Sequence, residues 1–228
     1  MNIKIAGIIG LSLIDYPDTL AGIIFLAGCN FRCPYCHNMN IVENIENLEM
    51  LEPEFVINEF KRRKKLLDGI VITGGEPTIY KNLPIFIKKI KEIGYKIKLD
   101  TNGYIPQIIK EIIEKNLVDF ISMDIKSSFD SQKYSRAAGV KVDIDKILES
   151  INIIKESNIN YEFRTTIINE YVDLEDIKNI ARYINPVKNY YIQTANKEWQ
   201  NFTSPPEKEI KKVIEELKTE GLNFINIR

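Results

Sequence analysis

Six short runs of apolar, largely β-branched residues recur along the chain, and longer amphipathic stretches separate them. Such runs are typical of buried strands, whereas the stretches between them carry apolar residues at helical spacing. The expected strands are Ile23–Leu26, Ile70–Thr73, Lys96–Leu99, Phe120–Met123, Tyr161–Thr165 and Tyr190–Gln193. A repeating strand–helix order predicts parallel strands joined by right-handed crossovers. Because six units do not close a regular eight-stranded barrel, we expect an α/β fold with a partial, splayed (β/α)6 TIM-like barrel.

Further segments flank these six units. We expect residues 3–14 to add a strand or hairpin before the first unit, and residues 223–227 to add an edge strand at the end. A helix is expected over 205–220, where Ser204 with Glu207 matches a capping box and Pro205 suits the first turn. A chain of 228 residues fits one large domain. We therefore expect a single domain over 1–228, with a core of about 20–195 and the C-terminal helix and strand within 205–228.

Composition and charge exclude several classes of partner. The net charge is −1, so there is no global basic field to attract nucleic acid or an anionic membrane. No run approaches the roughly 20 apolar residues of a membrane span, and the first residues are too short and too broken by glycine for a signal peptide. The three cysteines are clustered and odd in number, which argues against a disulfide framework and for a reducing, cytoplasmic environment.

All the thiols of the chain lie together, at Cys29, Cys33 and Cys36. Three thiolates can hold a 4Fe–4S cluster and leave its fourth iron free for another ligand. The alternative is a zinc site of the Cys3His type that uses His37, the only histidine. His37 directly follows Cys36, and adjacent residues rarely reach one tetrahedral metal together, so the cluster is favoured.

Polar residues and glycines follow most of the expected strands. They are Gly74-Gly75-Glu76-Pro77, Asp100-Thr101-Asn102-Gly103, Asp124-Ile125-Lys126, Thr166 and Thr194. In barrels of parallel strands the active site lies at the carboxyl ends of the strands. Each of these segments, taken alone, also reads as a turn or a surface ion pair. Arg164 is different, because an arginine inside a strand-like run is costly to bury unless it faces a polar cavity.

The motif Cys-x3-Cys-x2-Cys, with Tyr35 before the last cysteine, resembles the signature of the radical S-adenosylmethionine (SAM) superfamily. Gly74-Gly75-Glu76 looks like the Gly-Gly-Glu motif of that superfamily. The words Cys-Pro-Tyr-Cys-His-Asn, Asp-Thr-Asn-Gly and Met-Asp-Ile-Lys are similar to those of glycyl-radical-enzyme activating enzymes. Residues 10–17 and 25–29 look most like the activating enzymes of anaerobic ribonucleoside-triphosphate reductase. The resemblance extends from residue 7 to about residue 166.

The resemblance implies a role for each matching residue. Cys29, Cys33 and Cys36 would hold a 4Fe–4S cluster, with His37 beside it as a tuning neighbour. SAM would be contacted by Tyr35, Gly74, Gly75, Glu76, Asp124, Lys126 and Arg164, with Tyr35 against the adenine. As in pyruvate formate-lyase activating enzyme, Asp100, Thr101 and Asp124 would bind a monovalent cation.

The resemblance also implies an activity, that of an anaerobic oxidoreductase. Reductive cleavage of SAM would give a 5′-deoxyadenosyl radical, which would take hydrogen from a glycine of a glycyl-radical enzyme, anaerobic ribonucleotide reductase above all. The one-electron donor would be a flavodoxin or ferredoxin. Two alternatives stay open: a radical SAM enzyme with a small-molecule substrate, similar to 7-carboxy-7-deazaguanine synthase, and a non-catalytic metal- or cluster-binding module. Residues 15–20 depart from the family's Asp-Gly-Pro-Gly-Ile-Arg, which leaves the partner in doubt.

Two further features could contact a partner. The basic run of residues 61–65 is either a solvated helix face or a docking surface for an acidic partner or an electron donor. Trp199, the only tryptophan, either faces a partner or pins its loop to the barrel.

Overall fold

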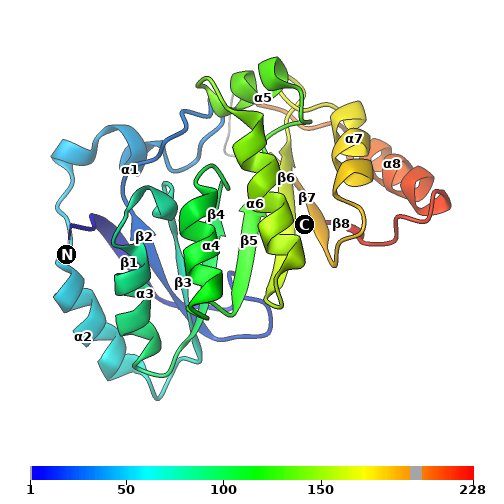
Figure 1. Ribbon diagram of the computed structural model, residues 1–228. Helices are drawn as coiled ribbons and strands as arrows, with labels where there is room; N and C mark the ends of the chain where they lie inside the picture. Colours follow the sequence, from blue (N-terminus) through cyan, green and yellow to red (C-terminus); the bar gives the residue numbers. More distant parts are fainter. Residues whose placement is uncertain (1, 196–201) are drawn as a thin grey trace.

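A computed structural model describes residues 2–195 and 202–228 of the chain, so Trp199 lies outside the described residues. Within them the chain forms one eight-stranded sheet in sequential order (Figure 1). The strands are β1 (Ile5–Ser12), β2 (Ala21–Leu26), β3 (Gly69–Gly74), β4 (Lys96–Thr101), β5 (Phe120–Asp124), β6 (Asn160–Ile167), β7 (Tyr190–Thr194) and β8 (Ile225–Ile227). The pair β1–β2 is antiparallel, and every later pair is parallel.

The six expected strands are confirmed as β2 to β7, and the two flanking strands as β1 and β8. The helices are α1 (Met39–Glu43), α2 (Pro53–Arg63), α3 (Leu83–Lys91), α4 (Pro106–Glu114), α5 (Ser131–Ala138), α6 (Ile144–Glu156), α7 (Leu174–Ile184) and α8 (Glu207–Thr219), with short 3-10 turns at Ile45–Asn47 and Pro77–Ile79. Figure 1 shows α3, α4 and α6 side by side over one face of the sheet. This is the α/β architecture of a partial TIM-like barrel.

The main core lies between the sheet and these helices. Strand residues such as Ile70, Ile72 and Leu99 are fully buried there, and Ile147 and Ile151 of α6 are buried against them, as their helical spacing predicts. A second, smaller cluster contains Tyr16, Ala21, Ile23 and Val71, with Phe25 and Phe120 packed against it. One face of the sheet thus packs apolar side chains against the helices. The other, inner face has the smaller apolar cluster and also carries charged side chains.

The prediction of a capping box at the start of α8 is wrong. The helix begins at Glu207 after Pro206, and no side chain caps it. Pro205 and Pro206 each disfavour helical backbone in the residue before them, so Ser204 and Pro205 remain outside the helix. The Ser204 hydroxyl instead accepts a hydrogen bond from the Ala195 N–H at 2.7 Å and donates one to the Ile167 carbonyl at 2.6 Å. Ser204 therefore ties the ends of β6 and β7 together.

Candidate functional site

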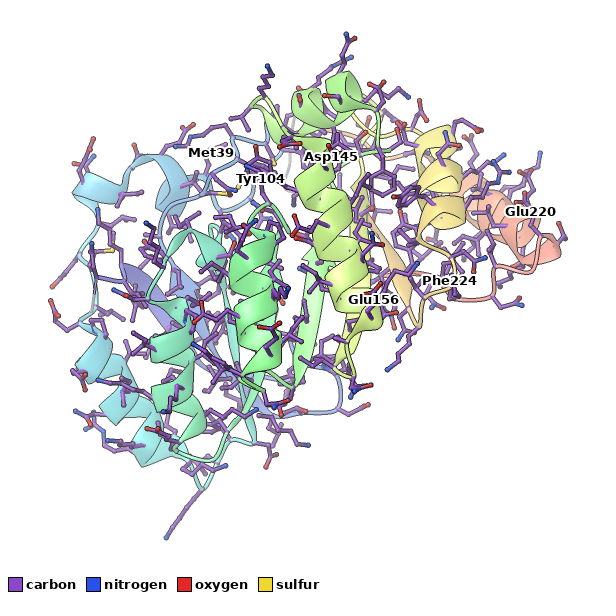
Figure 2. All side chains as sticks on the ribbon, viewed as in Figure 1. Met39, Tyr104, Asp145, Glu156, Glu220 and Phe224 are labelled. Atoms are coloured by element: carbon purple, nitrogen blue, oxygen red, sulfur yellow. The ribbon has the colours of Figure 1, made fainter. Side chains whose placement is uncertain are left out.

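A cavity of about 430 Å³ lies at the carboxyl ends of the strands. All the predicted site residues line it: Cys29, Cys33, Tyr35, Cys36, Gly74, Gly75, Glu76, Asp100, Thr101, Asp124, Lys126 and Arg164. His37, Asn38, Asn102, Thr166 and Thr194 line it as well. Figure 2 shows Met39, Tyr104 and Asp145 at this end of the molecule and Glu156 at the other. The topology therefore gathers segments from separate strand ends around one cavity.

The three cysteines form one side of the cavity. Cys33 is buried, and Cys29 and Cys36 are half-buried. Burial raises the pKa of Cys29 to about 12, and the nearby Glu76 carboxylate adds to this effect. Burial likewise raises the pKa of Cys33. As free thiols, Cys29 and Cys33 keep their protons at neutral pH, and the positive charge of a bound metal would be needed to displace those protons.

The donor set fits a cluster better than a single ion. A zinc ion requires its ligands to converge at about 2.0–2.3 Å. Within residues 2–195 and 202–228, no three Cys, His, Asp or Glu side chains are arranged to hold one metal ion. An iron–sulfur cluster instead binds each thiolate at a different iron, so its ligands need not meet at one point. Cys29, Cys33 and Cys36, which all line the cavity, therefore suit the ligand requirement of a cluster, and its binding stays a prediction.

The Gly-Gly-Glu loop is fastened to the loop that carries Cys29. The Gly75 N–H donates to the Leu26 carbonyl, and the Glu76 N–H donates to the Gly28 carbonyl, both at 2.8 Å. A Cβ atom at Gly75 would lie 1.9 Å from the Gly28 oxygen, a distance that no side chain tolerates. Glycine is thus required here because two backbones touch.

Glu76 joins the ends of β3 and β4. Its side chain is 1% exposed. One carboxylate oxygen accepts hydrogen bonds from the Thr78 N–H (3.0 Å), the Thr78 hydroxyl (2.6 Å) and the Thr101 hydroxyl (2.7 Å). The other accepts from the Asn102 N–H at 2.6 Å. Burial raises the pKa of Glu76, and these hydrogen bonds oppose the rise. The predicted contact of Glu76 with SAM stays a prediction.

Charged side chains form a connected group deeper in the cavity. Arg164 donates to Asp124 at 2.7 Å and lies 3.4 Å from Asp100, while Lys126 donates to Asp124 at 3.0 Å. Burial alone would raise the pKa of Asp124, but Arg164 and Lys126 outweigh it and hold that pKa well below its usual range. Arg164 is charged, and its pKa is raised by the same carboxylates against the effect of burial.

The predicted cation ligands are occupied by other partners. The Asp100 carboxylate pairs with Lys98 and Arg164, and the Asp124 carboxylate with Arg164 and Lys126. The Thr101 hydroxyl donates to Glu76 and accepts from the Gly103 N–H. The monovalent cation stays a prediction, and the structure provides ammonium and guanidinium groups beside the same carboxylates.

Two further residues of this charged group, Glu162 and Lys98, were not predicted from the sequence. Glu162, 1% exposed, accepts two hydrogen bonds from Arg228 at 3.0 and 3.2 Å and one from the Ser122 hydroxyl at 2.8 Å. Lys98 is equally buried. One signal was available: Lys98 and Asp100, like Glu162 and Arg164, lie two residues apart in a strand and so share a face.

Tyr35, which lines the cavity, is part of an aromatic cluster. Its ring centroid lies 5.7 Å from that of Tyr171 and 6.4 Å from that of Phe202, and its hydroxyl donates to the Lys126 carbonyl at 3.4 Å. Only 5% of Tyr35 is exposed. Stacking on adenine stays a prediction.

Comparison with known proteins identifies the family. The model of the Radical SAM superfamily matches residues 23–184. The chain belongs to the radical SAM superfamily. It is 36% identical over 223 residues, 93% of this chain and 91% of the relative, to a protein of Methanocaldococcus jannaschii that carries the name "putative glycyl-radical enzyme activating enzyme". The predictions of a radical SAM oxidoreductase and of a resemblance to these activating enzymes are confirmed.

Other proteins similar to this radical SAM chain include a second activating enzyme and enzymes with other names. It is 28% identical to the pyruvate formate-lyase-activating enzyme of Clostridium pasteurianum, over 82% of this chain and 78% of that protein. It is 30% identical to the 7-carboxy-7-deazaguanine synthase of M. jannaschii, over 72% and 69%. A radical SAM methyltransferase structure from Sphaerobacter thermophilus superposes with a TM-score of 0.74 at 15% identity, covering 96% of this chain and 68% of that chain. The chain spans about half the length of the Streptococcus suis SuiB structures, which it also matches in fold.

The basic run of residues 61–65 does not contribute to the cavity. The basic run lies at the end of α2, just before β3 begins, and therefore at the opposite end of the strands from the cysteines (Figure 1). Arg62 and Arg63 both pair with Glu59 there.

Among the described helices, none combines the length and the apolar character that a membrane span requires.

Proposed function

We propose that this radical SAM enzyme activates a glycyl-radical enzyme, and that anaerobic ribonucleoside-triphosphate reductase is its partner. The observation that carries the proposal is the gathering of three cysteines and the charged group of Asp124, Lys126 and Arg164 around one cavity. The similarity of nearly the whole chain to the M. jannaschii protein supports the activating role. The sequence words that resemble reductase activating enzymes support the choice of partner.

In this proposal Cys29, Cys33 and Cys36 hold a 4Fe–4S cluster, and SAM fills the rest of the cavity. When bound, the cluster supplies the one-electron reduction that splits the sulfonium of SAM and leads to hydrogen abstraction from a glycine of the partner. The protein residues bind and orient. Lys126 and Arg164 offer positive charge to the carboxylate of SAM, and Asp124 offers negative charge to its ammonium group.

In the proposal, the low solvent exposure of Asp124, Lys126 and Arg164 strengthens their interaction with SAM. Charged groups in a cavity of low dielectric interact more strongly than in water, so they fix the zwitterionic end of SAM in one orientation. The electron donor is a flavodoxin or a ferredoxin, and the reaction takes place anaerobically in the cytoplasm. In this proposal the electron donor does not dock on the basic run, because that run lies at the opposite end of the strands from the cysteines.

The first experiment tests the chemistry. The enzyme is reconstituted anaerobically with iron and sulfide, reduced with dithionite and incubated with SAM, and 5′-deoxyadenosine is measured. The wild type and the control variant Arg62→Ala, altered at the opposite end of the strands, should form the product. Cys33→Ala should form none above the protein-free background. Equal product from Cys33→Ala would contradict the cluster assignment.

A second experiment separates the protein substrate from a small molecule. The similarity to 7-carboxy-7-deazaguanine synthase makes a small-molecule substrate the alternative. The reduced enzyme and SAM are mixed with a purified anaerobic ribonucleoside-triphosphate reductase, and the organic radical is recorded by electron paramagnetic resonance. A glycyl radical supports the activating role. Formation of 7-carboxy-7-deazaguanine from a small-molecule extract, without a glycyl radical, would overturn it.

A further inference from the structure

Cys29 is reached by two N–H donors that belong to different parts of the chain. The Phe31 N–H donates to the Cys29 sulfur at 3.3 Å, within the cysteine loop. The side-chain amide of Asn102 lies 3.8 Å from the same sulfur and comes from the end of β4. The first contact is local, but the second depends on the whole arrangement of the strands.

The orientation of the Asn102 amide is determined by its neighbours. Its oxygen accepts a hydrogen bond from the Tyr104 N–H at 3.0 Å, so its NH2 group must face the other way. One hydrogen of that NH2 group serves the Asn30 side-chain oxygen at 2.8 Å, and the second serves the Cys29 sulfur. The Asn102 N–H is bound to Glu76 at 2.6 Å, and the residue is 5% exposed. Asn102 thus has little freedom to turn its donor elsewhere.

Asn30 supplies an independent observation. Its side-chain nitrogen is buried and has no hydrogen-bond partner among the described residues. Its oxygen lies 3.7 Å from the Cys29 sulfur, which acts as a thiol donor in this contact. When the thiol loses its proton to bind iron, that donor disappears and the sulfur becomes an acceptor only. A buried N–H donor that has no acceptor among the described residues, next to a cysteine, suits a site that binds a group rich in sulfur acceptors.

We propose that Asn102 is a positioning residue for Cys29, and that its amide raises the reduction potential of the cluster by donating a hydrogen bond to the Cys29 thiolate. The inference rests on the cluster assignment made above. An N–H donor draws electron density from a coordinating sulfur and stabilises the reduced cluster, which carries one more negative charge. A thiolate attracts the donor more strongly than a thiol does, so the contact shortens on loading.

Two variants test the proposal. Asn102→Asp keeps the acceptor for Tyr104 but places an oxygen where the NH2 group was, and Asn102→Leu removes the donor without adding charge. Ser150→Ala is the matched control: the Ser150 hydroxyl donates to the Gly103 carbonyl, so its loss loosens the same loop and spares the amide. The midpoint potential of each reconstituted protein is measured by redox titration with electron paramagnetic resonance, and iron and sulfide contents are determined separately.

Both Asn102 variants should have a more negative midpoint potential than the wild type, with Asn102→Asp the lowest, and Ser150→Ala should match the wild type. Wild-type potential in a fully loaded Asn102→Leu protein would overturn the inference, as would an equal shift in Ser150→Ala. Absence of a cluster from the wild type would instead contradict the proposed function, and the iron content distinguishes the two failures.

A second measurement includes a wild-type outcome that does not depend on how well the variants fold. Wild-type protein labelled with 15N-asparagine is reduced, and the hyperfine couplings of the cluster are recorded by pulsed electron paramagnetic resonance. A coupling to a side-chain nitrogen of asparagine is expected, and it should be lost or weakened in Asn102→Leu. No asparagine coupling in the wild type would overturn the inference.

Discussion

At the scale of the residue, Glu76 shows how a motif can serve structure as well as binding. Its carboxylate is the common acceptor for the backbone of Thr78 and Asn102 and for two threonine hydroxyls. Both oxygens are occupied, so the negative charge is stabilised by the protein itself. A group of this kind fixes the relative positions of two strand ends before any ligand arrives.

Glu76→Gln should therefore destabilise the protein. The amide is isosteric but presents an NH2 group to at least one N–H or O–H donor, and leaving a buried donor unsatisfied costs about 1–3 kcal/mol. The free energy of unfolding, measured by chemical denaturation, checks this. Glu215→Gln is the matched control, because Glu215 is exposed and pairs with Lys218 on the same helix. A Glu76→Gln protein as stable as the control would contradict the bracing role.

Asp124 gives the site a dependence on pH. Arg164 and Lys126 overcome the effect of burial and hold its folded-state pKa below the unfolded value of about 3.9. A depressed carboxyl pKa contributes stability that is present above the unfolded pKa and is lost as the pH falls through the folded pKa. Stability should thus fall below about pH 4, and more steeply in the wild type than in Asp124→Asn. Parallel pH profiles of unfolding free energy would contradict this origin.

At the scale of the element, the contact between the β3 end and the cysteine loop controls the site. Gly75→Ala would place a methyl group 1.9 Å from the Gly28 oxygen and push the loops apart. Overpacking of this kind costs about 1–3 kcal/mol, and we expect less iron to be retained after reconstitution. Gly7→Ala is the control, because no atom lies within 4 Å of a Cβ at Gly7. Full iron retention by Gly75→Ala would show that the two loops are independent.

The sequence predicted the elements better than the contacts between them. Hydrophobic periodicity located β2 to β7, because burial on one or both faces selects β-branched residues regardless of the neighbouring strand. The start of α8 was placed too early, at residue 205. Pro205 and Pro206 disfavour helical backbone in the residues before them, so Ser204 cannot cap a helix that begins at Glu207. The predicted site residues all line the cavity, since the carboxyl ends of parallel strands share one edge. The ion pair of Asp100 with Arg164 was not predicted, because its partners come from different strands. Lys98 and Glu162 were not predicted to pair with these two residues either, because only a spacing of two residues within a strand pointed to a shared face.

At the scale of the whole molecule, the inner face of the barrel is held by charge as well as by apolar packing. Asp100, Arg164, Asp124 and Glu162 come from three neighbouring strands, and Arg228 follows the last strand. The guanidinium of Arg228 also lies 4.1 Å from the centre of the Tyr191 ring. The chain beyond β7 thus reaches back to the same group of charges that lines the cavity above.

Arg228→Ala should therefore lower the free energy of unfolding of the protein. Breaking a fully buried ion pair costs about 3–5 kcal/mol, and exposed pairs contribute under about 1 kcal/mol. Glu162 is 1% exposed but Arg228 is 40% exposed, so we expect a loss of about 1–3 kcal/mol for Arg228→Ala. Arg182→Ala is the matched control, because Arg182 makes the same two-bond contact with Glu220 at a more exposed site. Its loss should be under about 1 kcal/mol.

A double variant separates the unpaired charge from the lost contact. In Arg228→Ala the Glu162 carboxylate is left buried near Arg164, whose nearest nitrogen is 4.0 Å away. Adding Glu162→Gln removes that charge, so the double variant should be more stable than Arg228→Ala alone if the uncompensated carboxylate causes the loss. Chemical denaturation of the four proteins of the cycle measures the coupling. A double variant as unstable as the sum of the single variants would mean that the two side chains act independently, and that packing on Tyr191 accounts for the role of Arg228.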